Sequence, residues 1–158
     1  MVLGNMDWPR QNVKYWRYTG KPKAAPLDGR WYFIMGDSDL GFGANAPVDA
    51  GLFVQVKDAH VPVSRLLLAM LRDERLKQRF IAITRSLIDG PLRPERCVTV
   101  LDSLITRMDP EMGRHTARWR KPMDKAHWLD EVAIVRDYAQ HRAAAVRKEL
   151  NVMAKERH

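Results

Sequence analysis

Carboxylate and amide side chains of the kind that move protons or hold metal ions gather near the start of the chain. Asp7 is followed by Asn12, and Asp37 and Asp39 flank Ser38 after an apolar segment. A turn at Ser38 would let both carboxylates converge on one hard cation such as Mg²⁺, which keeps several waters and bridges to substrate phosphates. The same residues could instead close the strand as an Asx-turn, so the Asp-x-Asp pattern alone leaves both interpretations open.

The spacing of Asp7 and Asn12 narrows the range of reactions that these side chains could catalyse. Protein kinases place an Asp and an Asn with this spacing in the catalytic loop, where the Asp accepts the proton of the substrate hydroxyl and the Asn ligates Mg²⁺. In those enzymes a hairpin then delivers a further Asp next to a glycine. The order is the same here, because a hairpin-like segment separates Asn12 from Asp37, Asp39 and Gly41. The two motifs in this order are a more specific indication of kinase chemistry than either the Asp7 and Asn12 pair or the Asp37 and Asp39 pair alone.

The elements that must position these residues fall into two unlike regions. Residues 1–60 are rich in glycine, proline and aromatic residues and predict strands and loops, whereas residues 61–158 carry the apolar spacing of helices. We expect a single domain over residues 1–158, of the α+β class. In it, a small β-hairpin and a metal-binding loop pack on a mainly helical bundle.

Two aromatic segments predict the hairpin. Residues 12–19 and 30–35 have strand composition, turn residues at 21–29 join them, and residues 37–51 follow as a loop. Because the second segment is uniformly apolar, we expect it to be buried on both faces against the first two helices. The residues expected to pack there are Trp31, Phe33 and Met35, or the opposite set, Tyr32 and Ile34.

Apolar residues at helical spacing predict helices from residue 61 onward. The predicted spans are 63–71, 80–88, 94–108 and 128–150. We expect the third helix to stop at Asp109-Pro110, because proline removes a backbone donor and clashes with the preceding turn. The following residues, up to 127, are ambiguous, with a short separate helix expected before Pro122.

The net charge and the composition limit the kinds of partner that we expect the protein to have. The net charge is +8, and the basic excess lies in residues 61–158, which attracts polyanions without choosing among them. No zinc-finger, basic-zipper or RNA-binding motif is present, so we expect no specific nucleic-acid partner. Cys97 is the single cysteine, which excludes an internal disulfide. Without a secretory signal pattern or an apolar run long enough to cross a bilayer, we expect a cytoplasmic protein with no membrane contact.

These motifs resemble those of the CotH kinases, atypical protein kinases first associated with bacterial spore coats. The resemblance extends over nearly the whole chain, and the two Asp-containing motifs are its specific part. The residues that carry it are Asp7-Trp8-Pro9-x-x-Asn12-x-x-x-Trp16-Arg17, Gly29-Arg30-Trp31-x-Phe33-Ile34, Asp37-x-Asp39-Leu40-Gly41-Phe42-Gly43, Arg79-Phe80, Pro110-Glu111-Met112, Arg118-Trp119, Trp128 and Arg142-x-x-x-Val146.

The resemblance implies a protein-kinase-like C-terminal lobe and phosphorylation that depends on ATP and on Mg²⁺ or Mn²⁺. The implied acceptor is a protein substrate rich in Ser and Thr. By position, the resemblance implies that Asp7 is the catalytic carboxylate and Asn12 its metal-binding partner. It also implies that Asp37 and Asp39 are the metal-binding pair that replaces the single Asp of ordinary kinases.

Members of that family also carry an N-terminal lobe that covers the ATP and supplies a lysine to its phosphates. The sequence starts just before the Asp7 motif, so we expect that lobe to be absent and the chain alone to transfer no measurable phosphate. The sequence is then expected to be a C-terminal fragment of a CotH-type kinase, or else a non-catalytic remnant of a kinase lobe, which uses its basic face as a protein-interaction module. The sequence makes no prediction about the oligomeric state.

Overall fold

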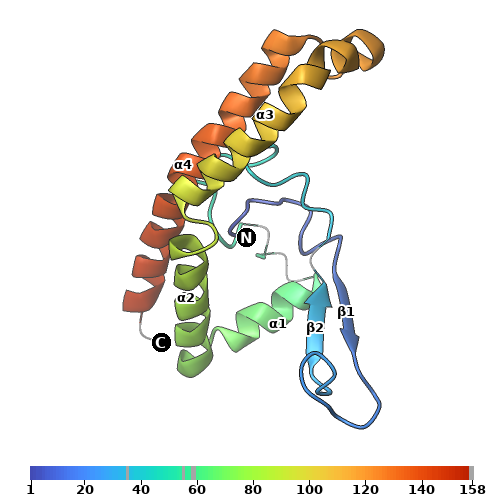
Figure 1. The fold of residues 1–158 in the computed structure, drawn as a ribbon. Coiled ribbons are helices and arrows are strands. Elements are labelled where there is room, and N and C mark those ends of the chain that lie inside the picture. The colour runs from blue at the N-terminus through green and yellow to red at the C-terminus, as the bar shows by residue number, and fades with distance from the viewer. Residues whose placement is uncertain (35, 55, 58–59, 157–158) are drawn as a thin grey trace.

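The computed structural model describes residues 1–34, 36–54, 56–57 and 60–156. Within them the chain is α+β, with a two-stranded antiparallel sheet and four helices (Figure 1). The elements are β1 (Lys14–Arg17), β2 (Trp31–Ile34), α1 (Pro62–Met70), α2 (Glu74–Asp89), α3 (Pro94–Trp119) and α4 (Lys125–Lys155). No helix in these residues is long and apolar enough to cross a membrane. The α+β class is confirmed, whereas the kinase-like lobe and the single-domain organisation stay predictions.

Helix α4 is the element against which α2 and α3 pack. Figure 1 shows α3 beside the N-terminal part of α4 and α2 beside its C-terminal part. Asp124 is the N-cap residue of α4, and its carboxylate accepts the N–H of His127 at 2.8 Å. Asp73 is the N-cap residue of α2, and its carboxylate accepts the N–H of Leu76 at 3.0 Å. Each carboxylate satisfies a backbone donor that has no partner inside its helix.

The main apolar core lies between α2, α4 and the loop that precedes α1. Its buried residues are Leu52, Ile81, Ile88, Ala143, Val146 and Leu150. Glu149 of α4 accepts the N–H of Leu52 with both carboxylate oxygens, each at 2.9 Å. These two hydrogen bonds attach the loop that follows the candidate site to α4.

The end of α3 differs from the sequence prediction. We expected the helix to stop at Asp109-Pro110, but it continues through Pro110 to Trp119. A proline inside a helix removes one hydrogen bond and costs about 3 kcal/mol. The turns beyond it bury Met112 and Thr116, and α3 packs along α4. Burial outweighs the proline, so these residues extend α3 rather than form a separate short helix.

The hairpin is confirmed, but its predicted burial against the helices is wrong. Strands β1 and β2 pair antiparallel along their whole length. Trp31 and Phe33 are each 60% exposed, and Ile34 is 49% exposed. Tyr32 is half-buried, and Met35 lies outside the described residues.

The exposed rings contact one another across the two strands instead of a helix. The ring centroid of Tyr15 lies 5.4 Å from that of Trp31 and 6.0 Å from that of Phe33. On the opposite face, Trp16 stacks on Tyr32 at 5.6 Å. Cross-strand pairs of this kind contribute about 0.2–1 kcal/mol each. An apolar strand segment can therefore form a two-stranded ribbon without a core beneath it.

Candidate active site

The segment before Asp7 runs beside the loop that follows β2. The N–H of Phe42 donates to the carbonyl of Leu3 at 2.9 Å. Asn5, which is 8% exposed, donates from Nδ2 to the carbonyl of Asp37 at 2.9 Å. Its Oδ1 accepts the N–H of Asp7, also at 2.9 Å. The structure therefore brings the backbones of Asp7 and Asp37 together through one side-chain amide.

Two glycines permit this close approach of the segments. A Cβ at Gly41 would lie 3.1 Å from the carbonyl oxygen of Ser38 and 3.2 Å from that of Leu3. Gly4 has a φ of +68°, and a Cβ there would lie 2.3 Å from the phenol oxygen of Tyr138. Larger residues at either position would push the two segments apart or displace Tyr138.

Arg142 of α4 fixes the N-terminal segment to the loop before α1. Its side chain is buried, with 5% of its surface exposed, and its guanidinium donates to four backbone carbonyls. The accepting residues are Met1 at 3.2 Å, Val2 at 3.0 Å, Val48 at 2.9 Å and Ala50 at 2.6 Å. Arginine alone offers five N–H donors in a rigid planar fork, so one buried side chain can join these separate segments.

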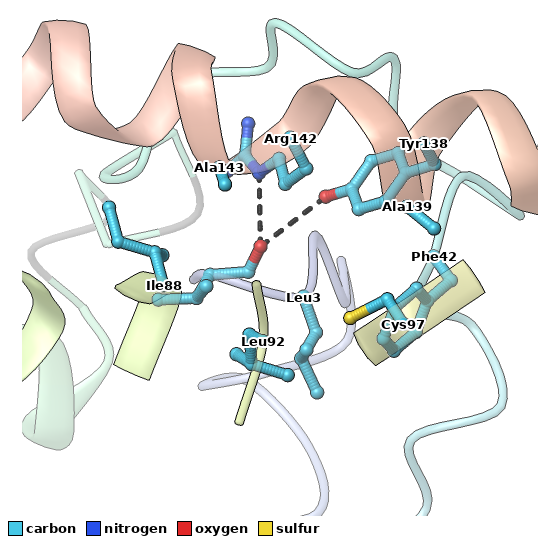
Figure 2. Close-up of a pocket in the computed structure, with 10 residues that line it drawn as sticks. Leu3, Phe42, Ile88, Leu92, Cys97, Tyr138, Ala139, Arg142 and Ala143 are labelled. Carbon is cyan, nitrogen blue, oxygen red and sulfur yellow. Dashed lines mark hydrogen bonds between the residues drawn. The ribbon is translucent and has the colours of Figure 1, made fainter. Parts of the chain in front are cut away.

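Tyr138 lies one turn before Arg142 on α4 and contacts the same segments. Figure 2 shows both side chains directed at one carbonyl, that of Val2. The ring of Tyr138 also packs edge-on against Phe42, with 6.0 Å between the centroids. Burial raises the pKa of the Tyr138 phenol, and the positive charge of Arg142 opposes part of that rise. We call Tyr138 and Arg142 together the α4 anchor.

Three residues around the site have a left-handed backbone conformation. The φ angle is +58° at Asn12, +51° at Asp37 and +54° at Phe42. Asn and Asp adopt this region several-fold more often than other residues with a side chain, whereas Phe rarely does. At Phe42 the ring contact with Tyr138 and the bond to Leu3 offset the strain. Backbone strain of this kind concentrates at functional sites.

The predicted site residues differ in exposure. Asp7 and Asn12 are half-buried, and Asp37 and Asp39 are exposed. Among the residues that the structure describes, no three His, Cys, Asp or Glu side chains lie close enough together to hold a metal ion. Mg²⁺ sites in proteins often use only one or two carboxylates, with substrate phosphates and water as the other ligands, so Asp37 and Asp39 are of the residue type that such a site requires. Metal binding by Asn12, Asp37 and Asp39 and proton transfer by Asp7 stay predictions.

The cavity drawn in Figure 2 lies beside the α4 anchor and is not a nucleotide site. Leu3, Phe42, Leu92 and Cys97 contribute to its lining, and its volume is about 20 Å³. A single water molecule needs about 10–15 Å³ on this measure, so a nucleotide cannot enter. Burial raises the pKa of the half-buried Cys97 thiol, which disfavours the thiolate form.

Sequence reasoning assigned no role to Asn5, Tyr138 or Arg142. Arg142 carried a signal, because it lies on the apolar stripe of the last helix, three residues after Ala139 and four before Val146. A charged residue on such a stripe must be buried with partners. Asn5 carried only a weak signal, as an amide two residues before a carboxylate.

Comparison with known protein families agrees with the resemblance noted in the sequence. The family model described as CotH kinase protein matches residues 1–146 of the 158. No curated protein and no solved structure matches the chain. A kinase family implies ATP and a divalent metal ion in general terms. The match includes Asp7, Asn12, Asp37 and Asp39 and most of α4, and the chain belongs to the CotH kinase family.

Proposed function

We propose that the protein transfers the γ-phosphate of ATP to Ser or Thr hydroxyls of a protein substrate, as a CotH-type kinase. The observation that carries this proposal is the amide of Asn5, which links the backbone of Asp7 to that of Asp37. Phosphoryl transfer is catalysed mainly by positioning and by charge stabilisation, so a kinase needs its proton acceptor and its metal ligands at a fixed separation. The α4 anchor supports the same arrangement by holding the segment that leads to Asp7.

Each predicted site residue has one role in this proposal. Asp7 accepts the proton of the substrate hydroxyl as the hydroxyl oxygen bonds to the γ-phosphorus and ADP leaves. Asn12, Asp37 and Asp39 are the residues that would hold Mg²⁺ or Mn²⁺. When bound, the ion supplies positive charge against the phosphates.

Transfer of radiolabelled phosphate from ATP to a Ser-rich protein tests the proposal, with Mg²⁺ and with Mn²⁺. The protein is expressed from its complete natural reading frame. Asp37→Ala should abolish transfer, because it removes a metal ligand. Asp7→Asn should lower the rate by about 10²–10⁴-fold, the usual contribution of a general base. Asp130→Ala removes an exposed carboxylate of α4 and should leave the rate unchanged.

Retained transfer by an Asp37→Ala, Asp39→Ala double variant would contradict the kinase assignment. The 158-residue chain, assayed alongside, tests the expectation that these residues alone transfer no measurable phosphate. Robust transfer by that chain would show that its own residues, or a second copy, complete the nucleotide site.

A non-catalytic interaction module is the second candidate function. Trp119, the last residue of α3, is 60% exposed, and Met123 in the turn that follows is 69% exposed. The guanidinium of Arg118 lies 4.8 Å from the centroid of the Trp119 ring. An exposed aromatic and basic surface suits an acidic partner protein. Two results together would favour this candidate. No form of the protein should transfer phosphate, and Trp119→Ala should abolish binding of poly-glutamate. Phe33→Ala, which changes an exposed ring elsewhere, should leave that binding unchanged.

A further inference from the structure

The side chain of Asn5 uses both ends of its amide between two segments that are distant in the sequence. Its Oδ1 accepts the N–H of Asp7, and its Nδ2 donates to the carbonyl of Asp37, 32 residues further along the chain. Both distances are 2.9 Å, and the residue is 8% exposed. Both are well-formed, part-buried hydrogen bonds, and partial burial makes such bonds stronger than those at the open surface.

The hairpin between Asn12 and Asp37 cannot hold the two segments in place by itself. Its strands are four residues each, and the rings of Trp31 and Phe33 face solvent. An isolated two-stranded ribbon is marginally stable in water. The separation of Asp7 from Asp37 therefore depends on contacts at the base of the hairpin, where Asn5 lies.

Asparagine is suited to this position because its short planar side chain carries a donor and an acceptor. Aspartate at position 5 would still accept the N–H of Asp7, but as a carboxylate it cannot donate to the carbonyl of Asp37. Alanine would make neither bond and would leave both backbone groups without this partner. Comparing the two variants therefore distinguishes loss of the bond to Asp37 alone from loss of both bonds.

We propose that Asn5 is a positioning residue that sets the separation between the proton acceptor Asp7 and the metal ligand Asp37. The inference rests on the proposed kinase function for the meaning of that separation. Asn5 acts through the backbone of its neighbours and touches no reacting atom. A misplacement of about 1 Å at a reacting centre can cost 10²-fold in rate. Asn5→Ala and Asn5→Asp should therefore each lower kcat by about 10–100-fold, with the KM for ATP little changed.

Amide hydrogen exchange tests the contact without any need for activity. In Asn5→Ala, the amide of Asp7 should exchange about 2–10-fold faster, the value expected for one lost hydrogen bond. In Asn5→Asp, the protection of that amide should remain. The amide of Val146, in the buried core, should exchange at the wild-type rate in both variants. Equal acceleration at Asp7 and Val146 would show a general stability role and overturn the proposal.

Paramagnetic broadening by Mn²⁺ tests the Asp37 side of the contact. In the wild type, amide signals of residues 7–12 and 37–43 should broaden at the same Mn²⁺ concentration. In Asn5→Asp, residues 37–43 should still broaden, whereas residues 7–12 should need a higher concentration. Asn45→Ala, which changes an exposed amide in the same loop, is the matched control and should behave as the wild type.

The outcomes separate this inference from the proposed function. If the wild-type protein expressed from its complete reading frame is inactive, the kinase function is refuted, and exchange and broadening still show whether Asn5 couples the two segments. An active wild type whose Asn5→Asp variant keeps its kcat and its broadening pattern would overturn the positioning role alone. If Asn5→Ala does not fold, Asn5→Asp decides the question, because it is nearly the same shape as asparagine.

Discussion

Two parts of the first 52 residues are held in place by different means. The segments around the candidate site, residues 1–7 and 37–52, are fixed to α4 by Arg142, by Tyr138 and by Glu149. The hairpin that joins them is stabilised by rings that contact one another and remain exposed. The position of the candidate catalytic residues is therefore set by a distant helix and by Asn5, and much less by the strands next to them in sequence.

The largest expected effect is at Arg142. Arg142→Ala should lower the free energy of unfolding by about 2–4 kcal/mol, because four part-buried backbone carbonyls lose a charged donor. Arg147→Ala, one turn and a half further along α4, removes an exposed ion pair with Asp89 and should cost at most about 1 kcal/mol. Urea denaturation of both variants measures the difference. Equal losses would show that the α4 anchor does not hold the site region.

The next effect is at Gly4. Gly4→Ala should lower the free energy of unfolding by about 1–3 kcal/mol, because φ is positive and the new Cβ would meet the Tyr138 phenol oxygen. Tyr138→Phe removes that oxygen, so Gly4→Ala should cost less in the Tyr138→Phe background. Gly36→Ala is the matched control, since a Cβ there meets nothing within 4 Å. Additive costs for Gly4→Ala and Tyr138→Phe would contradict the described contact.

The smallest effect is expected in the hairpin. Phe33→Ala should lower the free energy of unfolding by at most about 1 kcal/mol, since the ring is exposed and loses only cross-strand contacts. Ile88→Ala, in the core between α2 and α4, should cost about 2–5 kcal/mol. Thermal denaturation compares the two. A loss at Phe33 as large as that at Ile88 would mean that the hairpin packs on the body of the protein after all.

The sequence predicted what depends on local pattern and missed what depends on distant contacts. Alternation and turn residues placed the hairpin, and apolar spacing placed the helices. The rule that proline ends a helix failed at Pro110, because burial of Met112 and Thr116 stabilises the continuation of α3 beyond it. They also failed at Phe33, where an apolar residue pairs across a ribbon and stays exposed.

The candidate site shows the same division. The order Asp7, Asn12, Asp37, Asp39 is a sequence pattern and was readable as such. Apart from the bond between Asn5 and Asp7, the contacts that hold it join residues 32 to 141 positions apart, and no local rule reports which amide or guanidinium makes them.

The central claim is that residues 7–12 and 37–43 form one site for a metal ion and the phosphates of ATP. The most direct test maps amide signals of the wild-type protein during titration with Mn²⁺, without and with a non-hydrolysable ATP analogue. The account predicts weak broadening without nucleotide, because the protein supplies few ligands, and broadening at lower Mn²⁺ concentration when the analogue supplies phosphate oxygens. Both segments should broaden together, while the hairpin tip at residues 21–28 and the turn between α3 and α4 stay sharp. Broadening centred on any other part of the chain, or no response to the analogue, would contradict the account.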